Sequence, residues 1–459
     1  MQASGKLTLD LISSAEALTL PGLFLRRCER TPEAEAYRQY DPAAGTWQSY
    51  RWREMKALAG RWRAALAREN LAPGERVAIL LRNSVEWVCC DQAAQSLGLA
   101  VVPLYVTDNP ENIAYILRDC DARALLLRTA DQWQALAPLR ARFPGLARVL
   151  CIERTATAVA GAGIELSFVP DWLAAEAEAM SAGEIDAHSL ATIVYTSGTM
   201  GRPKGVMLSH HNILSNAEAV LKLVPAYRED LFLSFLPLSH SFERTVGYYL
   251  PIMTGSTVAF ARSAQDLAQD LLDIRPTLLV SVPRIYERFY ARLQQGLEKK
   301  GLAARALFAW AERIGWRRFE ATQGRGAAPG ALANLLWPLL RRLAAEQVLA
   351  RLGGRLRLAI SGGAPLSPKL ARCFIGLGVP LLQGYGLTEA APIVSGNLIE
   401  DNVPDSVGVP LPGIELKLAG QNELLVRGPN VMLGYWNRPQ DTREAIDADG
   451  WLHTGDQAR

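Results

Sequence analysis

A glycine- and hydroxyl-rich loop follows a predicted buried strand near the middle of the chain. The strand is expected at 191–195, and the loop reads Tyr195-Thr-Ser-Gly-Thr-Met-Gly-Arg-Pro-Lys-Gly-Val206. Glycines let successive backbone N–H groups point at one anion, and hydroxyls add donors. Lys204 adds a mobile positive charge that suits phosphate. The loop therefore predicts a phosphate site made by Thr196, Ser197, Gly198, Thr199, Gly201 and Lys204.

Two features separate this loop from the common ATPase phosphate loop. That loop needs two glycines separated by four residues, with lysine and then a hydroxyl residue directly after the second glycine. Here Gly198 and Gly201 are three positions apart, and Pro203 precedes Lys204. A plain surface turn is the alternative interpretation. Stacked glycines, hydroxyls and a lysine behind an apolar strand favour phosphate binding.

Four more segments carry polar side chains further along the chain, and three of them are rich in glycine. They read Leu236-Pro-Leu-Ser-His240, Ser361-Gly-Gly-Ala-Pro365, Gln383-Gly-Tyr-Gly-Leu-Thr-Glu389 and Gly450-Trp-Leu-His-Thr-Gly-Asp456. With the phosphate loop they resemble, in order, the motifs of the adenylate-forming superfamily, which holds acyl-CoA synthetases, peptide-synthetase adenylation domains and luciferases. The resemblance implies an α/β, multi-lobed N-terminal domain with a small β-rich subdomain near the C-terminus. It also implies ATP-dependent activation of a carboxylic acid as an acyl-adenylate.

The resemblance assigns roles to single residues. It implies that Thr196 and Glu389 hold Mg²⁺, that Thr388 contacts the α-phosphate and that Tyr385 offers a flat face to adenine. It implies that Asp456 accepts hydrogen bonds from the ribose hydroxyls. The other nucleotide-binding residues that it implies are Gly363, Ala364, Pro365, Gln383, Gly384 and Gly386.

The expected chemistry agrees with those residue types. A carboxylate attacks the α-phosphorus of ATP and pyrophosphate leaves, so two anions must meet and the site must supply positive charge and donors. Mg²⁺ favours the oxygens of carboxylates, hydroxyls and phosphates. The resemblance puts His240 beside the acyl carboxylate, although a single histidine is more often a packed core residue. The predicted catalytic residues are Lys204, His240, Thr388 and Glu389.

Two features favour a long-chain fatty acid and coenzyme A as the other substrates. Val280-Ser-Val-Pro-Arg-Ile-Tyr-Glu-Arg-Phe-Tyr290 is similar to a segment of long-chain acyl-CoA synthetases, and a long basic, aromatic insertion follows it. A medium-chain or aromatic acid, or transfer to a carrier-protein thiol, stays open. Some fatty-acid members carry an aromatic gate four places after the motif histidine. Here that position is Arg244, so the gate is expected elsewhere, and Glu243 with Arg244 could form an ordinary helical charge pair.

The insertion is unusually basic. Residues 291–360 contain 13 Lys and Arg, 4 Glu and no Asp, whereas the whole chain has a net charge of +3. Arginines alternate there with Trp and Phe, which is typical of a surface for anionic lipid or for the phosphates of coenzyme A. The plain alternative is a helix with a solvated face. A peripheral contact with an anionic membrane through 291–360 is therefore a hypothesis.

Short apolar strands that alternate with helices must position these motifs. Strands are expected at 76–81, 100–105, 124–127, 191–195, 231–235, 257–260, 278–281 and 356–360, and helices at 23–30, 57–68, 86–97 and 112–119. This alternation is typical of parallel α/β sheets. A hairpin is expected at 414–418 and 423–427. We expect a first lobe at about 1–190, a second at about 191–396 with the insertion at 291–356, and a β-rich subdomain at about 397–459.

The bulk composition adds limits. The chain has 459 residues and 49% hydrophobic residues, and its six cysteines form no C-x-x-C pair, which predicts buried free thiols in a reducing, cytoplasmic setting. No apolar run reaches the roughly 18 residues of a membrane span. The superfamily's hinge and small closing domain would follow Asp456, so the sequence also leaves open a nucleotide- and acyl-binding protein with little turnover, or a membrane-surface module. It predicts no oligomeric state.

Overall fold

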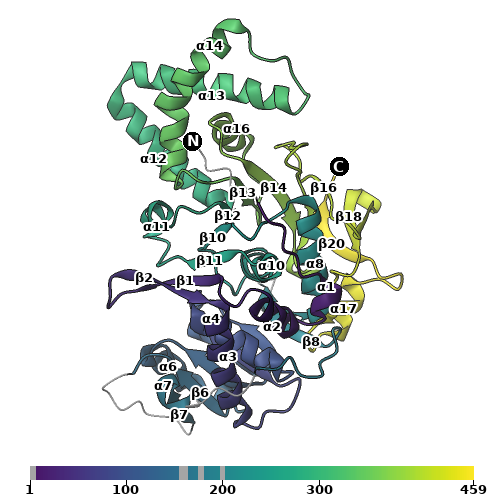
Figure 1. The fold of residues 1–459 in the computed structure, drawn as a ribbon. Helices are drawn as coiled ribbons and strands as arrows, with labels where there is room; N and C mark the ends of the chain where they lie inside the picture. The colour runs from purple at the N-terminus through teal and green to yellow at the C-terminus, as the bar shows by residue number, and fades with distance from the viewer. Residues whose placement is uncertain (1–6, 155–163, 174–179, 197–201) are drawn as a thin grey trace.

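The computed structural model describes residues 7–154, 164–173, 180–196 and 202–459. Two large sheets and a small third sheet form an α/β fold, with helices on the faces of the large sheets (Figure 1). Most of the N-terminal third lies at the bottom of the view, the helices α12 (Pro283–Lys300), α13 (Leu302–Thr322) and α14 (Ala331–Leu340) stand at the top, and the C-terminal strands lie at the right. The α/β fold with a small β-rich C-terminal part confirms the predicted fold class.

The nine-stranded sheet is parallel at its centre and antiparallel at both edges. Most of its central strands are buried along their whole length, as expected for parallel strands covered on both faces. In spatial order its strands are β16 (Val409–Pro410), β15 (Ile393–Gly396), β14 (Leu381–Gly386), β13 (Leu358–Ser361), β12 (Leu278–Ser281), β10 (Leu231–Ser234), β11 (Thr257–Phe260), β1 (Glu35–Asp41) and β2 (Thr46–Arg51).

The eight-stranded sheet is parallel from β8 outward through β7, and β9 and β19 add antiparallel strands to its other edge. In spatial order its strands are β19 (Gly434–Tyr435), β9 (Lys204–Ser209), β8 (Leu190–Thr196), β4 (Ala100–Pro103), β3 (Arg76–Leu80), β5 (Ala122–Leu127), β6 (Arg148–Cys151) and β7 (Glu165–Phe168). The third sheet holds β17 (Glu415–Leu418), β18 (Glu423–Arg427) and β20 (Leu452–Gln457).

The helices begin where side chains can cap them. Ser84 Oγ accepts a hydrogen bond from the Trp87 N–H at the start of α4, and Ser209 and Asn212 cap α8 reciprocally. The helices are α1 (Ser14–Ala17), α2 (Leu20–Arg30), α3 (Trp52–Ala67), α4 (Val85–Ser96), α5 (Pro110–Asp119), α6 (Ala130–Leu136), α7 (Val169–Trp172), α8 (His210–Leu223), α9 (Ser241–Arg244), α10 (Leu250–Thr254), α11 (Leu267–Ile274), α12 (Pro283–Lys300), α13 (Leu302–Thr322), α14 (Ala331–Leu340), α15 (Glu346–Arg351), α16 (Pro368–Gly376) and α17 (Pro439–Ala445).

Most predicted elements are confirmed with shifted ends. The expected hairpin is present as β17 and β18, and the strand expected at 356–360 is β13, which begins two residues later. Ten strands were missed, namely β1 and β2, which form an antiparallel hairpin, β9 directly after the phosphate loop, and β6, β7, β14, β15, β16, β19 and β20. All six cysteines are buried free thiols, as predicted.

The sheets exchange strands between distant parts of the chain. β1 and β2, near the N-terminus, extend the nine-stranded sheet, whereas β8 and β9 belong to the eight-stranded sheet with β3 to β7. β19 joins the C-terminal segment to β9 by pairing Tyr435 with Val206. This last pairing brings C-terminal side chains to the end of the phosphate loop.

Candidate active site

A cavity of about 160 Å³ lies at the carboxyl ends of β13 and β14. One part of its wall is polar and comes from seven predicted residues, namely His240, Gly363, Gln383, Gly384, Tyr385, Gly386 and Thr388. The other part is apolar and comes largely from α8 and the neighbouring strands, through Val220, Leu223, Val224, Val246, Ile360 and Leu382. The cavity therefore joins a polar site to an apolar one.

Two glycines of the predicted motifs have a steric reason to be there. Gly363 has φ +77°, a left-handed backbone conformation that favours glycine. A Cβ on Gly386 would lie 2.0 Å from the Pro392 carbonyl oxygen, so no side chain fits. Both glycines line the cavity, where they keep the backbone open to a ligand. Ala364 and Pro365 are exposed and do not line it.

Gln383 holds the neighbouring loop in place. Its Oε1 accepts a 2.6 Å hydrogen bond from the Leu366 N–H, and its Nε2 donates to the Ser406 carbonyl at 3.3 Å. The side chain is buried, and the two bonds tie β14 to the loop that follows β13 and to the segment between β15 and β16. Gln383 therefore shapes the loop over the cavity through its side chain.

His240 and Thr388 meet across the cavity through Ser241. The Ser241 and Thr388 hydroxyls lie 3.1 Å apart. The His240 Nδ1 accepts a hydrogen bond from the Phe242 N–H at 3.2 Å, which leaves Nε2 as the protonated nitrogen of a neutral ring. Desolvation by the surrounding protein lowers the pKa of His240, although the ring is reachable through the cavity. His240 is therefore a neutral hydrogen-bond donor at pH 7.

Tyr385 and Asp456 are joined at one side of the cavity. The Tyr385 hydroxyl donates a 2.5 Å hydrogen bond to Asp456 Oδ2, so β14 meets β20 there. Burial and the nearby carboxylate raise the pKa of the Tyr385 hydroxyl, which keeps it a donor. The contact places the carboxylate assigned to ribose next to the ring assigned to adenine.

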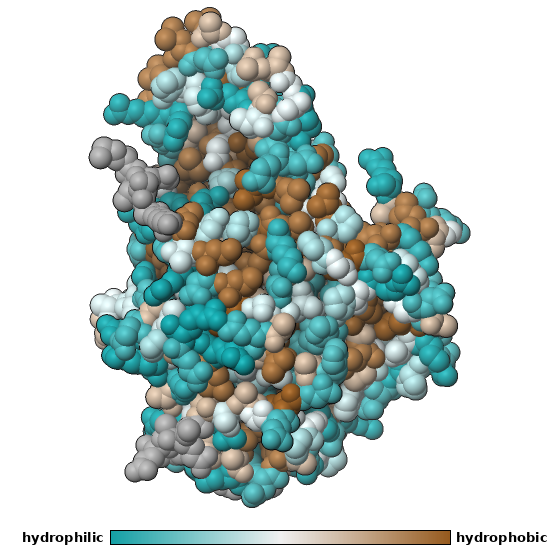
Figure 2. Space-filling view, turned by 45° about the vertical axis from the view of Figure 1, so that its right-hand side comes forward, coloured by the Kyte–Doolittle hydropathy of each residue, from teal (hydrophilic) through white to brown (hydrophobic). Residues whose placement is uncertain are grey.

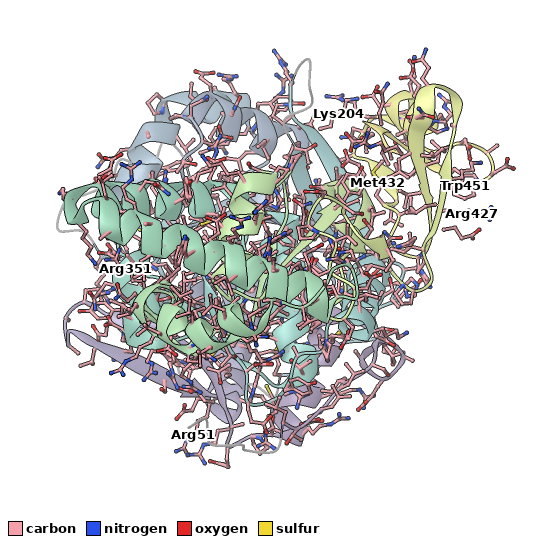
Figure 3. All side chains as sticks on the ribbon, turned by 90° about the horizontal axis from the view of Figure 1, so that it is seen from above. Arg51, Lys204, Arg351, Arg427, Met432 and Trp451 are labelled. Carbon is pink, nitrogen blue, oxygen red and sulfur yellow. The ribbon has the colours of Figure 1, made fainter. Side chains whose placement is uncertain are left out.

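A second cluster surrounds Lys204. Its Nζ lies 2.8 Å from Asp441 Oδ2 and 5.1 Å from the centre of the Tyr435 ring. The Tyr435 hydroxyl donates a 2.8 Å hydrogen bond to Glu389 Oε1. Thr196 pairs with Lys204 in the ladder of β8 and β9. Contacts thus connect all five residues, and Figure 3 shows Lys204 beside the C-terminal strands.

This cluster can hold a hard cation. Glu389 supplies a partly exposed carboxylate and Thr196 a partly exposed hydroxyl, which are oxygen ligands of the kind that Mg²⁺ takes together with substrate phosphates. Ser197, Gly198, Thr199 and Gly201 lie outside the described residues. Tyr435, Asp441 and Ser241 were not predicted, although the aromatic pair after Gly434 was a visible signal.

The AMP-binding enzyme family matches residues 24–436, which is most of the chain. The chain belongs to the AMP-binding enzyme family. It is 33% identical over 391 residues to "Long-chain-fatty-acid--CoA ligase FadD15" of Mycobacterium bovis, which covers 83% of this chain and 63% of that protein. It is 31% identical over 442 residues to "Long chain acyl-CoA synthetase 6, peroxisomal" of Arabidopsis thaliana, covering 90% and 60%.

Solved structures agree on the fold of this family member. The N-terminal domain of FACL13 from Mycobacterium tuberculosis has a TM-score of 0.70 at 22% identity and covers 95% of this chain and 96% of that one. ATP-bound MatB from Rhodopseudomonas palustris has a TM-score of 0.71 at 24% identity, covering 95% and 76%. The chain spans about three-fifths of the length of the curated relatives it matches.

Glu243 and Arg244, which follow His240, do not pair with each other in this AMP-binding enzyme. The Arg244 guanidinium lies 2.5 Å from Asp91 Oδ1 and donates to Thr192 Oγ1 at 2.7 Å, fully buried. Glu243 accepts a 2.6 Å hydrogen bond from Ser234, and its other oxygen has no partner among the described residues. Burial raises the pKa of Glu243 to about 8. Arg244 belongs to the core, and the charge pair considered from the sequence is absent.

A larger crevice of about 650 Å³ opens beside the carboxyl ends of β3 and β5. The connection after β3 leads to β4 on one side, and the one after β5 leads to β6 on the other. In α/β sheets such a switch point is the usual place for a ligand. Three arginines line the crevice, Arg82, Arg128 and Arg262. Arg128 and Arg262 have carboxylate partners, but Arg82 has none among the described residues.

Proposed function

We propose that this AMP-binding enzyme activates a long-chain fatty acid with ATP as acyl-adenylate and passes the acyl group to coenzyme A. The observation that carries the proposal is the cavity in which a polar wall with His240, Tyr385 and Thr388 meets an apolar wall from α8. An acyl-adenylate has the same two halves. The printed names of the relatives, which are long-chain ligases and synthetases, support the choice of acid.

The residues act first by binding and orientation. Tyr385 lies against adenine and Asp456 accepts the ribose hydroxyls, so the α-phosphate comes to Thr388. Mg²⁺ held by Glu389 and Thr196 would supply positive charge to the phosphate oxygens. Lys204 leaves Asp441 for the departing pyrophosphate, because a phosphate carries more charge than a carboxylate. No covalent enzyme intermediate is needed.

His240 orients the carboxylate that attacks. Because its Nδ1 accepts the Phe242 N–H bond, its Nε2–H can donate to the acyl carboxylate without forming a tight ion pair. The fatty chain then lies along the apolar side of the cavity, on Val220 and Leu223 of α8 and on Val224 directly after it. Water leaves that side when the chain binds, which favours long chains by about 0.8 kcal/mol for each buried CH₂.

The crevice at β3 and β5 suits the nucleotide part of coenzyme A. Arg82 offers a guanidinium without a carboxylate partner, and Arg262 lies 4.8 Å from the centre of the Tyr40 ring. Phosphate groups bind such arginines bidentately. Asn83 lines the same crevice and donates to the Leu236 carbonyl at 2.7 Å, so the crevice borders the segment that leads to His240.

The basic insertion suits peripheral contact with an anionic bilayer. Within the described residues, no helix is long and apolar enough to cross a membrane. Leucines of α14 nevertheless point outward: Leu332 is 70% exposed and Leu335 is 76% exposed. Figure 2 shows hydrophobic surface at the top of the molecule, where α14 stands in Figure 1. Arg313 and Arg317, on the exposed face of α13, add positive charge.

ATP–pyrophosphate exchange with acids of graded length tests the proposal. We expect exchange to rise from octanoate to palmitate and to be low with benzoate. A second assay should follow thioester formation with coenzyme A and with a carrier-protein thiol. Exchange that is fastest with benzoate, or absent with every acid while ATP still binds, would overturn the proposed activity. If the acyl group is transferred faster to the carrier-protein thiol than to coenzyme A, only the proposed acceptor would have to change.

A further inference from the structure

An apolar groove runs along α12, outside the candidate active site. Two adjacent cavities of about 230 and 260 Å³ form it, and they share Arg292, Leu293, Val348 and Arg351. The other walls come from α11, α13, α15, α16 and the π-helical segment Arg341–Ala345 that joins α14 to α15. Figure 3 shows Arg351 far from Lys204, so the groove is a separate place on the molecule.

The lining of the groove is that of a site for a hydrocarbon chain. Its apolar side chains include Leu272, Phe289, Leu293, Leu297, Phe308 and Leu343. From Arg292 to the end of α12 at Lys300 the helix runs about 12 Å at 1.5 Å per residue, which takes the first part of an extended long acyl chain. An exposed apolar surface of this kind gains free energy when such a chain covers it.

The charges on the groove all have one sign. Arg292, Arg351 and Lys300 line it, and no Asp or Glu does. Arg292 and Arg351 form no ion pair or hydrogen bond with any described residue. Both arginines line both cavities, so their guanidinium groups offer donors that one carboxylate in the groove could accept.

We infer that this groove binds the anion of a long-chain fatty acid, with its carboxylate on Arg292 and Arg351 and its chain along α12. The inference rests on the proposed function, because a free long-chain acid is then the enzyme's substrate and must reach it from a bilayer. Leu343 at the groove continues the exposed stripe of Leu332, Leu335 and Leu339 at helical spacing. The groove therefore opens from the surface proposed to face lipid, and it receives the acid before the active site does.

Photolabelling with a diazirine analogue of palmitate, without ATP or coenzyme A, tests this site. Peptide mapping should find label on 289–308 and 343–352. The variant Arg292→Gln/Arg351→Gln should lose about tenfold of that label, whereas Arg284→Gln/Arg305→Gln, which removes two exposed arginines of α12 and α13 outside the groove, should keep it. Palmitate should compete for the label, and hexadecyltrimethylammonium, with an equal chain and a positive head, should not.

Three results would overturn the inference. They are label confined to the cavity at His240 and Thr388, label on α12 unchanged in the groove variant, and equal competition by the cationic amphiphile. Thermal unfolding of both double variants checks that they fold alike. Loss of pyrophosphate exchange with groove label intact would reject the proposed activity alone, so the two failures are distinguishable.

Discussion

The Nζ of Lys204 lies 2.8 Å from Asp441 Oδ2, so a carboxylate of α17 holds the lysine assigned to phosphate. We predict that Lys204→Ala lowers kcat/KM for pyrophosphate exchange by about 100-fold while the Kd for AMP changes less than threefold. A charge-assisted contact of this kind contributes roughly 1.5–3 kcal/mol, and AMP lacks the phosphates that Lys204 would touch. Isothermal titration with AMP and exchange kinetics give the two numbers.

Asp441→Asn is the matched control for that experiment. The pair with Lys204 is partly exposed on both sides, and such ion pairs contribute about 0–1 kcal/mol. Exchange should therefore change less than about fivefold. Equal losses of AMP affinity and of exchange in Lys204→Ala would contradict a role at pyrophosphate.

The second prediction concerns Glu389 and the metal. Glu389→Gln keeps an acceptor for the Tyr435 hydroxyl, which now donates to Glu389 at 2.8 Å, but it removes the negative charge that Mg²⁺ prefers. The Mg²⁺ concentration for half-maximal exchange should rise more than tenfold, with the melting temperature kept. Tyr435→Phe should raise this Mg²⁺ concentration far less, because the substitution removes one hydrogen bond and no metal ligand. An unchanged Mg²⁺ dependence in Glu389→Gln would reject the assignment.

The third prediction concerns the pair of Tyr385 and Asp456. If Asp456 accepts the ribose hydroxyls, Asp456→Ala should weaken AMP binding by about ten- to 100-fold, or roughly 1.5–3 kcal/mol. Wild-type protein should bind 2′,3′-dideoxy-AMP correspondingly worse than AMP, and the variant should bind both alike. Tyr385→Phe keeps the flat ring and serves as the control. A variant that still discriminates between the two nucleotides would refute the ribose contact.

The fourth prediction follows from Glu243. Its pKa is raised by burial from 4.5 to about 8, so the folded protein keeps a proton that the unfolded chain releases above about pH 4.5. Stability should therefore fall as pH rises from about 4.5 to about 8, by up to about 1.4 kcal/mol per pH unit from this group. Glu243→Gln should remove this part of the pH dependence of stability, so the variant should become more stable relative to wild type as pH rises. Denaturant unfolding of both proteins at pH 5 and pH 8.5 measures the free energy of unfolding. An equal change between the two pH values in wild type and in Glu243→Gln would contradict the prediction.

The elements predicted well from the sequence are those whose type is set by the local pattern of apolar and polar residues. The buried strands β10 and β12 are short apolar runs, and the hairpin of β17 and β18 shows alternation around a polar turn. The hairpin of β1 and β2 was missed because β2 is an edge strand with no buried residue, and only Ala36 and Tyr37 of β1 are buried. Edge strands of this composition carry little hydrophobic periodicity.

The part of the candidate site that could be predicted from the sequence is the part formed by residues of single motifs. Most of the polar residues that line the cavity come from motifs whose glycines and hydroxyls stand out in the sequence, whereas its apolar wall from α8 belongs to no motif. Lys204 and Asp441 are 237 positions apart, so their contact could not be predicted from residue spacing. Arg244 finds Asp91 rather than Glu243, because neighbouring residues on a helix point in different directions. Contacts that form only through tertiary packing could not be predicted from the sequence.

The last prediction concerns the bilayer. The lobe of α12 to α14 should bind anionic vesicles at low salt and release them as salt rises, because the Debye length is about 8 Å at physiological ionic strength. Each well-placed cation contributes roughly 1 kcal/mol near anionic headgroups. Arg313→Gln/Arg317→Gln should therefore lower vesicle binding by about tenfold or more at low salt, with nucleotide affinity unchanged. Arg318 is a poor choice for this test, since it donates to Asn334 at 2.6 Å and lies over the Trp337 ring.

The leucine stripe supplies the part of the binding that salt does not screen. Leu335→Gln/Leu339→Gln should weaken binding at all salt concentrations, since apolar contact does not depend on ionic strength. Arg26→Gln/Arg443→Gln, which removes two arginines outside the lobe, is the matched control and should sediment like wild type. Sedimentation that neither salt nor the arginine and leucine variants alter would mean that this lobe does not face the membrane.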